Sequence, residues 1–212
     1  MGITERKERE RQEMRQLILE AAKTVFIEEG YEKASIRAIA ERIEYSPATI
    51  YLYFKDKDEL FYVVHEMGFE KMLTQMKHLE GIENPLERLR QRGSMYMKFA
   101  FENPELYDLM FISRAPMKAL HKDFENSEWD CGHRNFELLC RNVHECLEQG
   151  YLRAMNLHVA AMAIWSFVHG MASLHIRERF KIIDERLDIE RMTEEALDGM
   201  LTMLQPTTHQ HP

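Results

Sequence analysis

Residues 35–57 read Ser-Ile-Arg-Ala-Ile-Ala-Glu-Arg-Ile-Glu-Tyr-Ser-Pro-Ala-Thr-Ile-Tyr-Leu-Tyr-Phe-Lys-Asp-Lys. Ser35 begins one short helix as an N-cap, and Ser46 followed by Pro47 begins a second over about 47–53. A turn of about three residues, 44–46, joins the two helices. The inward positions form a small apolar core: Ile36, Ile39, Ala40, Ile43, Ile50 and Phe54. This pattern predicts a helix-turn-helix, whose second helix can enter a DNA major groove.

The second helix exposes small and hydrogen-bonding side chains instead of a charged face. Small residues at its start allow a close approach to DNA, hydroxyls can reach phosphates, and apolar edges can touch thymine methyls. Lysines flank the start of the next helix, where free backbone N–H groups favour an anion. The predicted DNA-facing residues are Pro47, Ala48, Thr49, Tyr51, Tyr53, Lys55 and Lys57. The alternative is that both tyrosines are core aromatics and Lys57 an ordinary surface lysine.

Helical periodicity continues on both sides of this stretch. Apolar residues from Met14 to Phe26 recur at helical spacing, and Gly30 stands at the expected C-cap. Asp56 and Glu59 form a capping box for a helix to about Leu79. Further helices are expected over 85–103, 104–112, 127–150, 157–180 and 189–205, with one short helix after Pro116. The chain is therefore predicted to be all-α, with about nine or ten helices.

Composition excludes several classes of protein. The 212 residues include only 9 Gly and 6 Pro, which favours long helices over collagen-like or disordered chains. The longest apolar run, 159–165, is too short for a membrane span, and the N-terminus lacks a secretory signal, so we expect a cytoplasmic protein without a membrane partner. Residues 1–57 carry balanced charge, whereas the rest holds the whole net charge of −8. Only the first part can comfortably approach a polyanion.

Residues 11–71 resemble the TetR family of bacterial transcription regulators. The resemblance rests on Arg15-Gln-Leu-Ile-Leu-Glu-Ala-Ala22, Phe26, Gly30-Tyr31, Ser35-Ile-Arg-x-Ile-Ala40, Thr49-Ile-Tyr51, Phe54 and Lys57-Asp-Glu-Leu60. It adds Ser35 and Arg37 to the expected DNA-facing residues, and Ser46 is expected among them at the start of the second helix. Glu44 and Ala48 stand where the family often has glycine. The resemblance implies DNA binding by residues 1–57 and ligand binding and dimerisation by 58–206. The polar stretch 207–212 is expected to be a disordered tail.

The C-terminal region resembles the family's Trp-His-Gly type through Asn103–Tyr107 and Trp165–Leu174. The helix from Leu157 is apolar nearly all round, so it needs cover on more than one side. A homodimer interface is expected at Ala161, Val168, Ala196, Leu197, Met200 and Leu204, with a purely intramolecular core as the alternative. A pocket for a hydrophobic or amphipathic effector is expected at Met67, Met72, Met97, Tyr107, Phe111, Trp165 and His169. Abundant methionine suits such a pocket and also suits a gap-filling core.

The expected function is a sequence-specific regulator, most simply a repressor of a palindromic operator that an effector releases. No cofactor, metal or catalytic group is expected, because no Ser-His-Asp or phosphate-loop pattern occurs. One alternative is an all-α small-molecule carrier or enzyme that does not bind DNA. Another is a metal sensor, because Cys140 and His144 share a helix face and Cys131, His133 and Cys146 lie nearby.

Overall fold

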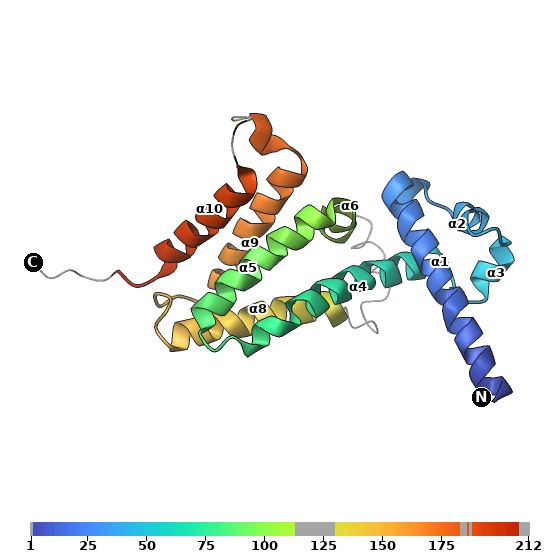
Figure 1. Ribbon diagram of the computed structural model, residues 1–212, viewed down its shortest axis with the longest axis horizontal. Coiled ribbons are helices and arrows are strands. Elements are labelled where there is room, and N and C mark those ends of the chain that lie inside the picture. The colour runs from blue at the N-terminus through green and yellow to red at the C-terminus, as the bar shows by residue number, and fades with distance from the viewer. Residues whose placement is uncertain (1, 113–129, 183–185, 187, 208–212) are drawn as a thin grey trace, which may run out of the picture. The chain divides into compact units, whose positions relative to one another are not determined.

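The computed structural model describes residues 2–112, 130–182, 186 and 188–207 (Figure 1). These residues contain nine α-helices and no strand, which confirms the all-α prediction. The helices are α1 Ile3–Lys33, α2 Ile36–Arg42, α3 Pro47–Tyr51, α4 Lys57–Met76, α5 Pro85–Glu102, α6 Pro104–Tyr107, α8 Asp130–Glu148, α9 Leu157–Ile176 and α10 Ile189–Leu204. The short helix expected after Pro116, a cap at Ser127 and positions 208–212 of the expected tail lie outside the described residues.

Packing divides the chain into two compact units. Unit 1 comprises residues 1–69 and 105–130, and unit 2 comprises 70–104 and 131–212. This division departs from the domain boundary predicted after residue 57. The reason is that Leu60, Phe61 and Val64 of α4 are buried in the same apolar core as α1, α2 and α3.

The core of unit 1 forms on the predicted stripe of α1. Ile18, Ala22 and Phe26 are buried there and pack with the inner faces of α2 and α3. The ring of Phe61 on α4 meets Phe26 edge-on, with ring centroids 4.9 Å apart. Burial of such side chains is the main stabilising contribution to this unit, at roughly 25 cal/mol per Å² of apolar surface.

A π-helical segment at Asp108–Ile112 follows α6 and packs against α4. His65 on α4 donates from Nε2 to the Met110 carbonyl at 3.1 Å, and burial lowers the pKa of His65 to about 4. Gly68 lies directly under Met110, because a Cβ there would meet the Met110 Sδ at 2.5 Å. The neutral imidazole of His65 and the absence of a side chain at Gly68 together allow the π-helical segment to pack closely against α4.

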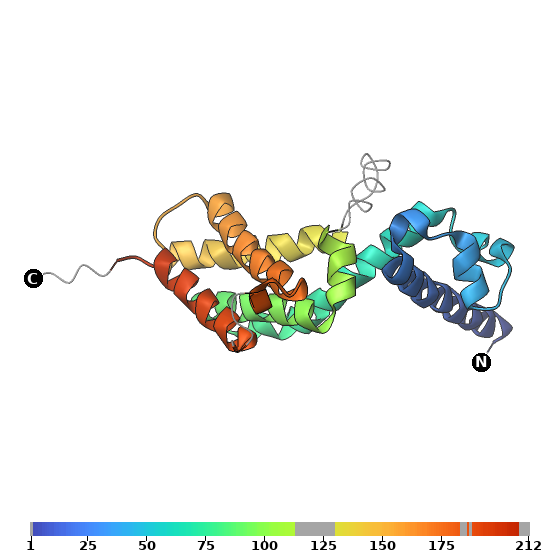
Figure 2. The ribbon, with the colours of Figure 1, turned by 90° about the horizontal axis from the view of Figure 1, so that it is seen from above.

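Unit 2 is a helical bundle in which α9 and α10 both pack against α5 (Figures 1 and 2). Gly93 on α5 faces Leu197 and Val168, which a Cβ would approach to within 3.0–3.4 Å. Ion pairs connect α5 to α8 and to the segment before α5. Arg88 pairs with Glu145 on α8, and Glu80 accepts from Arg92 at 2.7 Å and from Arg141 at 2.6 Å.

The turn between α2 and α3 contains a strained residue. Glu44 has a φ of +60°, in the left-handed region that favours glycine. Its N–H donates to the Glu41 carbonyl, and the N–H of Tyr45 donates to the Ala40 carbonyl, which holds the turn in place. A non-glycine residue in this region costs roughly 1–2 kcal/mol.

We predict that Glu44→Gly stabilises the protein by up to about 1 kcal/mol. Relief of the left-handed strain is partly offset by the larger entropy of glycine in the unfolded chain. The matched control is Glu41→Gly inside α2, which should destabilise by about 1 kcal/mol. Denaturant unfolding of both variants measures the effect. Equal destabilisation by the two glycines would contradict the assigned strain.

Candidate nucleic-acid interface

Serines stand at the N-cap positions of α2 and α3, and of the two only the Ser35 side chain forms a cap hydrogen bond. The Ser35 Oγ accepts from the Ala38 N–H at 3.1 Å, so this side chain is the predicted N-cap of α2. At the start of α3 the Ser46 Oγ and Thr49 Oγ1 are 3.2 Å apart and share a hydrogen bond. The Thr49 N–H donates to the Ser46 carbonyl at 2.9 Å. Both hydroxyls therefore lie together at the N-terminal end of α3.

The outer face of α3 is open to solvent. Ile50 and Phe54 are buried in the unit 1 core, and this fixes which side of the helix faces outward. Pro47 and Ala48 are exposed, and Tyr51 is 57% exposed. Tyr53, in contrast, is half-buried and packs against the core, so it presents less of its ring than expected. The structure thus brings the small residues and one tyrosine together on one surface.

Two exposed apolar side chains beside this surface were missed by the sequence reasoning. Leu52 is 77% exposed and Tyr45 is 45% exposed. The signal for Leu52 was present, because it lies outside the inward spacing of Ile50 and Phe54. Tyr45 is in the turn, where helical periodicity assigns no face.

Lys57 is placed differently from the expectation that it faces DNA. Its Nζ donates to the Tyr31 carbonyl at 2.8 Å and to the Ala34 carbonyl at 3.1 Å, and lies 4.2 Å from the centroid of the Tyr31 ring. Two of its three donors therefore hold the end of α1. Lys55, which lies just before α4, is exposed.

The other charged groups near the interface are engaged in surface ion pairs. Arg37 pairs with Glu41 at 2.7 Å, and Arg42 forms a fork with Glu28 at 2.6 and 2.9 Å. Such exposed pairs contribute little to stability, so Arg37 can exchange its partner for a phosphate at small cost. The first turns of α1 carry pairs of the same kind, including Arg6 with Glu10.

The residues expected to bind an effector fall into both units. In unit 1, Tyr107 is buried with its ring 4.8 Å from that of Phe111, and Met67 packs against the core. In unit 2 the Tyr96 hydroxyl is hydrogen-bonded to the Nδ1 of His169 at 3.1 Å.

The other expected effector residues of unit 2 differ in exposure. Met72 and Met97 are buried, whereas Trp165 is 36% exposed. Burial, followed by the nearby charge of Arg177, lowers the pKa of His169.

The residues expected at the dimer interface are largely covered by their own chain. Ala161, Val168, Leu197 and Met200 are buried. Ala196 and Leu204 are half-buried. Their helical spacing places them on the inner side of α9 and α10. The exposed apolar stripe consists of Val159, Met162, Ala163 and Leu174 on α9 and Met192, Gly199 and Met203 on α10.

Helix α9 is also long and apolar enough to cross a membrane, judged by length and composition alone. Only 28% of its apolar window is buried, and the rest includes the exposed stripe. The uninterrupted apolar run 159–165 is shorter than this helix, because alanine, glycine, serine and histidine extend the uncharged stretch on both sides to Leu157–Ile176.

The thiols show no metal-binding arrangement within the described part of the chain, where no group of three or more Cys, His, Asp or Glu could hold an ion. Cys146 is buried, and burial raises the pKa of its thiol to about 12. Burial and the neighbouring Glu137 raise the pKa of Cys140. Both shifts disfavour the thiolate that a metal needs.

Helices α2 and α3 thus form a helix-turn-helix with an exposed second helix, a motif that many DNA-binding proteins use. Residues 18–64 match the family described as "Bacterial regulatory proteins, tetR family", and residues 89–200 match "Tetracyclin repressor-like, C-terminal domain". The chain belongs to the TetR family of bacterial transcriptional regulators.

Named relatives agree with this family. The transcriptional regulator HbdR of Aromatoleum sp. is 26% identical over 92% of this chain and 81% of its own length. The repressor KstR of Rhodococcus jostii is 33% identical, but over only 46% of each chain. The fold is similar to that of the fatty acid degradation regulator FadR from Bacillus halodurans, with a TM-score of 0.69, 19% identity, and coverage of 92% and 97%.

We predict that Lys57→Met destabilises the protein by about 1–3 kcal/mol, because the Tyr31 and Ala34 carbonyls lose a charged donor. The matched control is Lys55→Met, which removes an exposed lysine and should change stability by less than about 0.5 kcal/mol. Thermal unfolding compares the two variants. If both leave the unfolding temperature unchanged, Lys57 does not hold the end of α1.

Proposed function

We propose that this regulator is a cytoplasmic repressor that binds a palindromic operator as a homodimer and leaves it when a hydrophobic or amphipathic effector binds. The observation that carries the DNA part is the outward face of α3. Small residues, paired hydroxyls and one exposed tyrosine lie there on a buried core. The rival reading is an all-α carrier or enzyme without DNA binding, which has no need of such a face.

The α3 surface suits reading of a major groove. Pro47 and Ala48 permit close approach of the helix N-terminus, while the Ser46 and Thr49 hydroxyls can contact phosphate. Tyr51 can donate to a phosphate or base edge. Leu52 adds an exposed apolar side chain that can meet a thymine methyl. Lys55 supplies the cation, and Ser35 and Arg37 lie at the exposed start of α2.

Tyr51→Ala is expected to cost about 1–3 kcal/mol of specific binding to an operator selected from genomic fragments. Lys55→Met should weaken binding to all sequences and reduce the salt slope by about one unit. Lys77→Met removes an exposed lysine elsewhere and serves as the control. Fluorescence anisotropy across a salt series measures each effect. Unchanged operator affinity in both variants, Tyr51→Ala and Lys55→Met, would show that α3 does not contact the operator.

The exposed stripe of α9 and α10 supports a homodimer. It presents methionine, valine and leucine beside small residues such as Ala163 and Gly199, which allow helices to approach closely. A two-fold axis through this face would pair two helices from each subunit, which is an isologous interface. A symmetric dimer then presents two α3 helices to two half-sites, and this requires a palindromic operator.

Placing a charge on this outer stripe should separate the subunits. Met162→Glu or Met203→Glu would bury a carboxylate near its symmetry mate, and sedimentation should show a monomer with operator binding lost. Lys77→Glu is the control, because it changes charge at an exposed site off the stripe. Circular dichroism must show an intact fold in each. A variant that stays dimeric would show that the interface does not lie on the outer stripe of α9 and α10.

The effector class is supported by the apolar composition of the expected site and by the solved structures that share the fold. One is the regulator FadR from Bacillus subtilis in complex with stearoyl-CoA, with a TM-score of 0.70 and 17% identity. Another is the ketosteroid regulator KstR2 of Mycobacterium tuberculosis, with a TM-score of 0.67 and 16% identity. Stearoyl-CoA joins a long apolar chain to a polar head, and a ketosteroid is an apolar ring system with polar oxygen atoms. An effector can release DNA only by binding one state of the dimer more tightly than the other.

A thermal-shift screen should show stabilisation by an apolar organic ligand. Fatty acids, stearoyl-CoA, a steroid and the ions Zn²⁺ and Cu²⁺ form the panel. A ligand at 100 times its Kd adds about 2.7 kcal/mol, which corresponds to a rise of several degrees. Stabilisation by a metal alone, abolished by Cys140→Ser, would replace this proposal with the metal sensor.

A further inference from the structure

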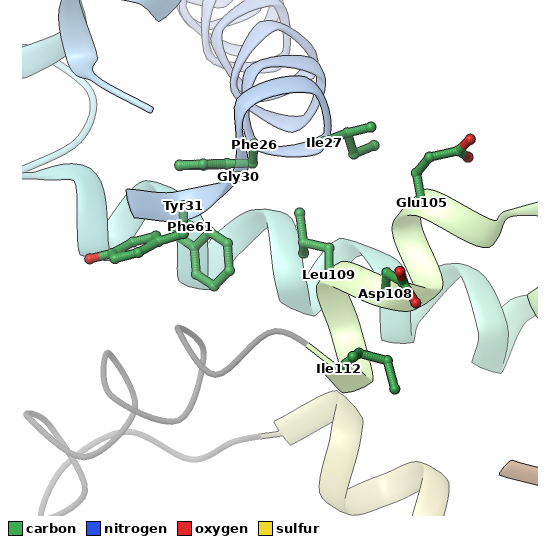
Figure 3. Close-up of a pocket in the computed structure, with 9 residues that line it drawn as sticks. All are labelled: Phe26, Ile27, Gly30, Tyr31, Phe61, Glu105, Asp108, Leu109 and Ile112. Carbon is green, nitrogen blue, oxygen red and sulfur yellow. The ribbon is translucent and has the colours of Figure 1, made fainter. Parts of the chain in front are cut away.

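The N-terminal turns of α1 extend beyond the core of unit 1. At its other end the helix is held by α4, where Phe26 lies beside Phe61 with the ring centroids 4.9 Å apart (Figure 3). Residues 4–13 are exposed, in contrast, and this part of the helix continues past α3 in Figure 1. Lys7 lies about 16 Å from the buried Ile18 along the helix axis, at 1.5 Å per residue. The side chains of these turns are therefore accessible to another molecule.

The face of α1 that packs into the core becomes cationic in these turns. Ile18, Ala22 and Val25 are buried positions of this face. Lys7 and Arg11 stand eleven and seven residues before Ile18, which is about three and two helical turns, so they lie on the same face. The face thus changes from apolar to charged where its burial ends, and its residue types there suit a charged partner.

No carboxylate is assigned to Lys7 or Arg11 within the described part of the chain, because each glutamate between residues 5 and 13 has a different partner. The pairs are Arg6 with Glu10 at 2.7 Å, Arg9 with Glu13 at 3.6 Å, Gln12 with Glu8 at 2.7 Å and the Gly2 N–H with Glu5 at 2.9 Å. Side chains four residues apart on a helix have their Cβ atoms about 5–6 Å apart. Two positive charges therefore stand side by side on this face.

Arg15 connects this face to the helix-turn-helix. Its guanidinium carbon lies 5.1 Å from the centroid of the Phe54 ring. Phe54 follows α3 in the chain and is followed in turn by the exposed Lys55. Arg15 also stands four residues after Arg11, so it is the next cation on the same face. The α1 stripe, made of Lys7, Arg11 and Arg15, thus begins beside the end of α3 and follows α1 toward its N-terminus.

We propose that Lys7 and Arg11 bind backbone phosphates of the DNA duplex whose major groove receives α3. The occupant follows from charge and place, because the two accessible cations continue a face that starts beside α3 and duplex DNA presents a dense row of anions. The inference rests on the proposed function and adds a second element to the DNA interface. Phosphate contacts carry no base information, so the α1 stripe orients α3 on the duplex and strengthens binding to every sequence.

The test compares the full chain with the double variant Lys7→Gln and Arg11→Gln, on an operator selected from genomic fragments and on a random duplex of the same length. Fluorescence anisotropy across a salt series should show that the slope of log affinity against log salt falls by about two units for each bound subunit, at about 0.9 per phosphate. Affinity should fall by a similar factor for both duplexes, because all sequences share the phosphates. Ethylation interference should identify phosphates whose modification weakens the parent but not the double variant.

The matched control is Arg6→Gln with Arg9→Gln, which removes two cations from the same turns but from positions paired with glutamates. This control should leave the ethylation pattern unchanged and lower the salt slope by less than about one unit. Exchanging the two cations, Lys7→Arg with Arg11→Lys, keeps both charges and should retain the affinity of the parent. Circular dichroism should show the same helix content in every variant, because all four substituted side chains are exposed.

Equal losses in the two glutamine double variants would overturn the proposal, because binding would then follow net charge and not the α1 stripe. Parent-like binding by the Lys7 and Arg11 variant would overturn it as well. If Tyr51→Ala still weakens operator binding in that case, the proposed function stands without the stripe. If the parent binds neither duplex, the proposed function and the α1 stripe both fail.

Discussion

The contact between the first turns of α4 and the end of α1 supports the rest of unit 1. Phe61 packs edge-on against Phe26 and Tyr31, with ring centroids 4.9 and 4.8 Å apart. Helix α3 has only five residues, and an isolated helix of that length does not form in water. It exists because Ile50 and Phe54 are buried in a core that α1 and α4 complete. The exposed face of α3 is thus a product of packing on longer helices.

Polar groups at the same junction give the contact its geometry. Lys57 donates to the last carbonyls of α1, and the Tyr31 hydroxyl bonds to Asp58 on the first turn of α4. A lysine in this place satisfies helix-end carbonyls that would otherwise lack partners. Its position in the sequence, beside the recognition helix, is equally typical of a phosphate contact. The two roles differ only in where the side chain points, and the fold determines that direction.

The same limit applies to the apolar stripes of α9 and α10. Helices α9 and α10 are apolar on more than one side, so helical spacing predicts several stripes without telling which one their own chain covers. Gly93 decides the matter for Leu197, because the absence of a side chain on α5 lets α10 approach and bury it. The outward residues, such as Met162 and Met203, are then left to solvent. The same reasoning separates Tyr51 from Tyr53, because Tyr53 packs against the unit 1 core and Tyr51 remains exposed.

The all-α class, the side-chain caps at Ser35 and Asp56 and the helix-turn-helix follow from the sequence alone, because each depends on residues close together in the chain. Family membership follows equally from those local spacings. Tertiary structure decided where the Lys57 ammonium points and which faces of α9 and α10 are covered by their own chain. These depend on contacts between residues distant in sequence, which periodicity does not encode.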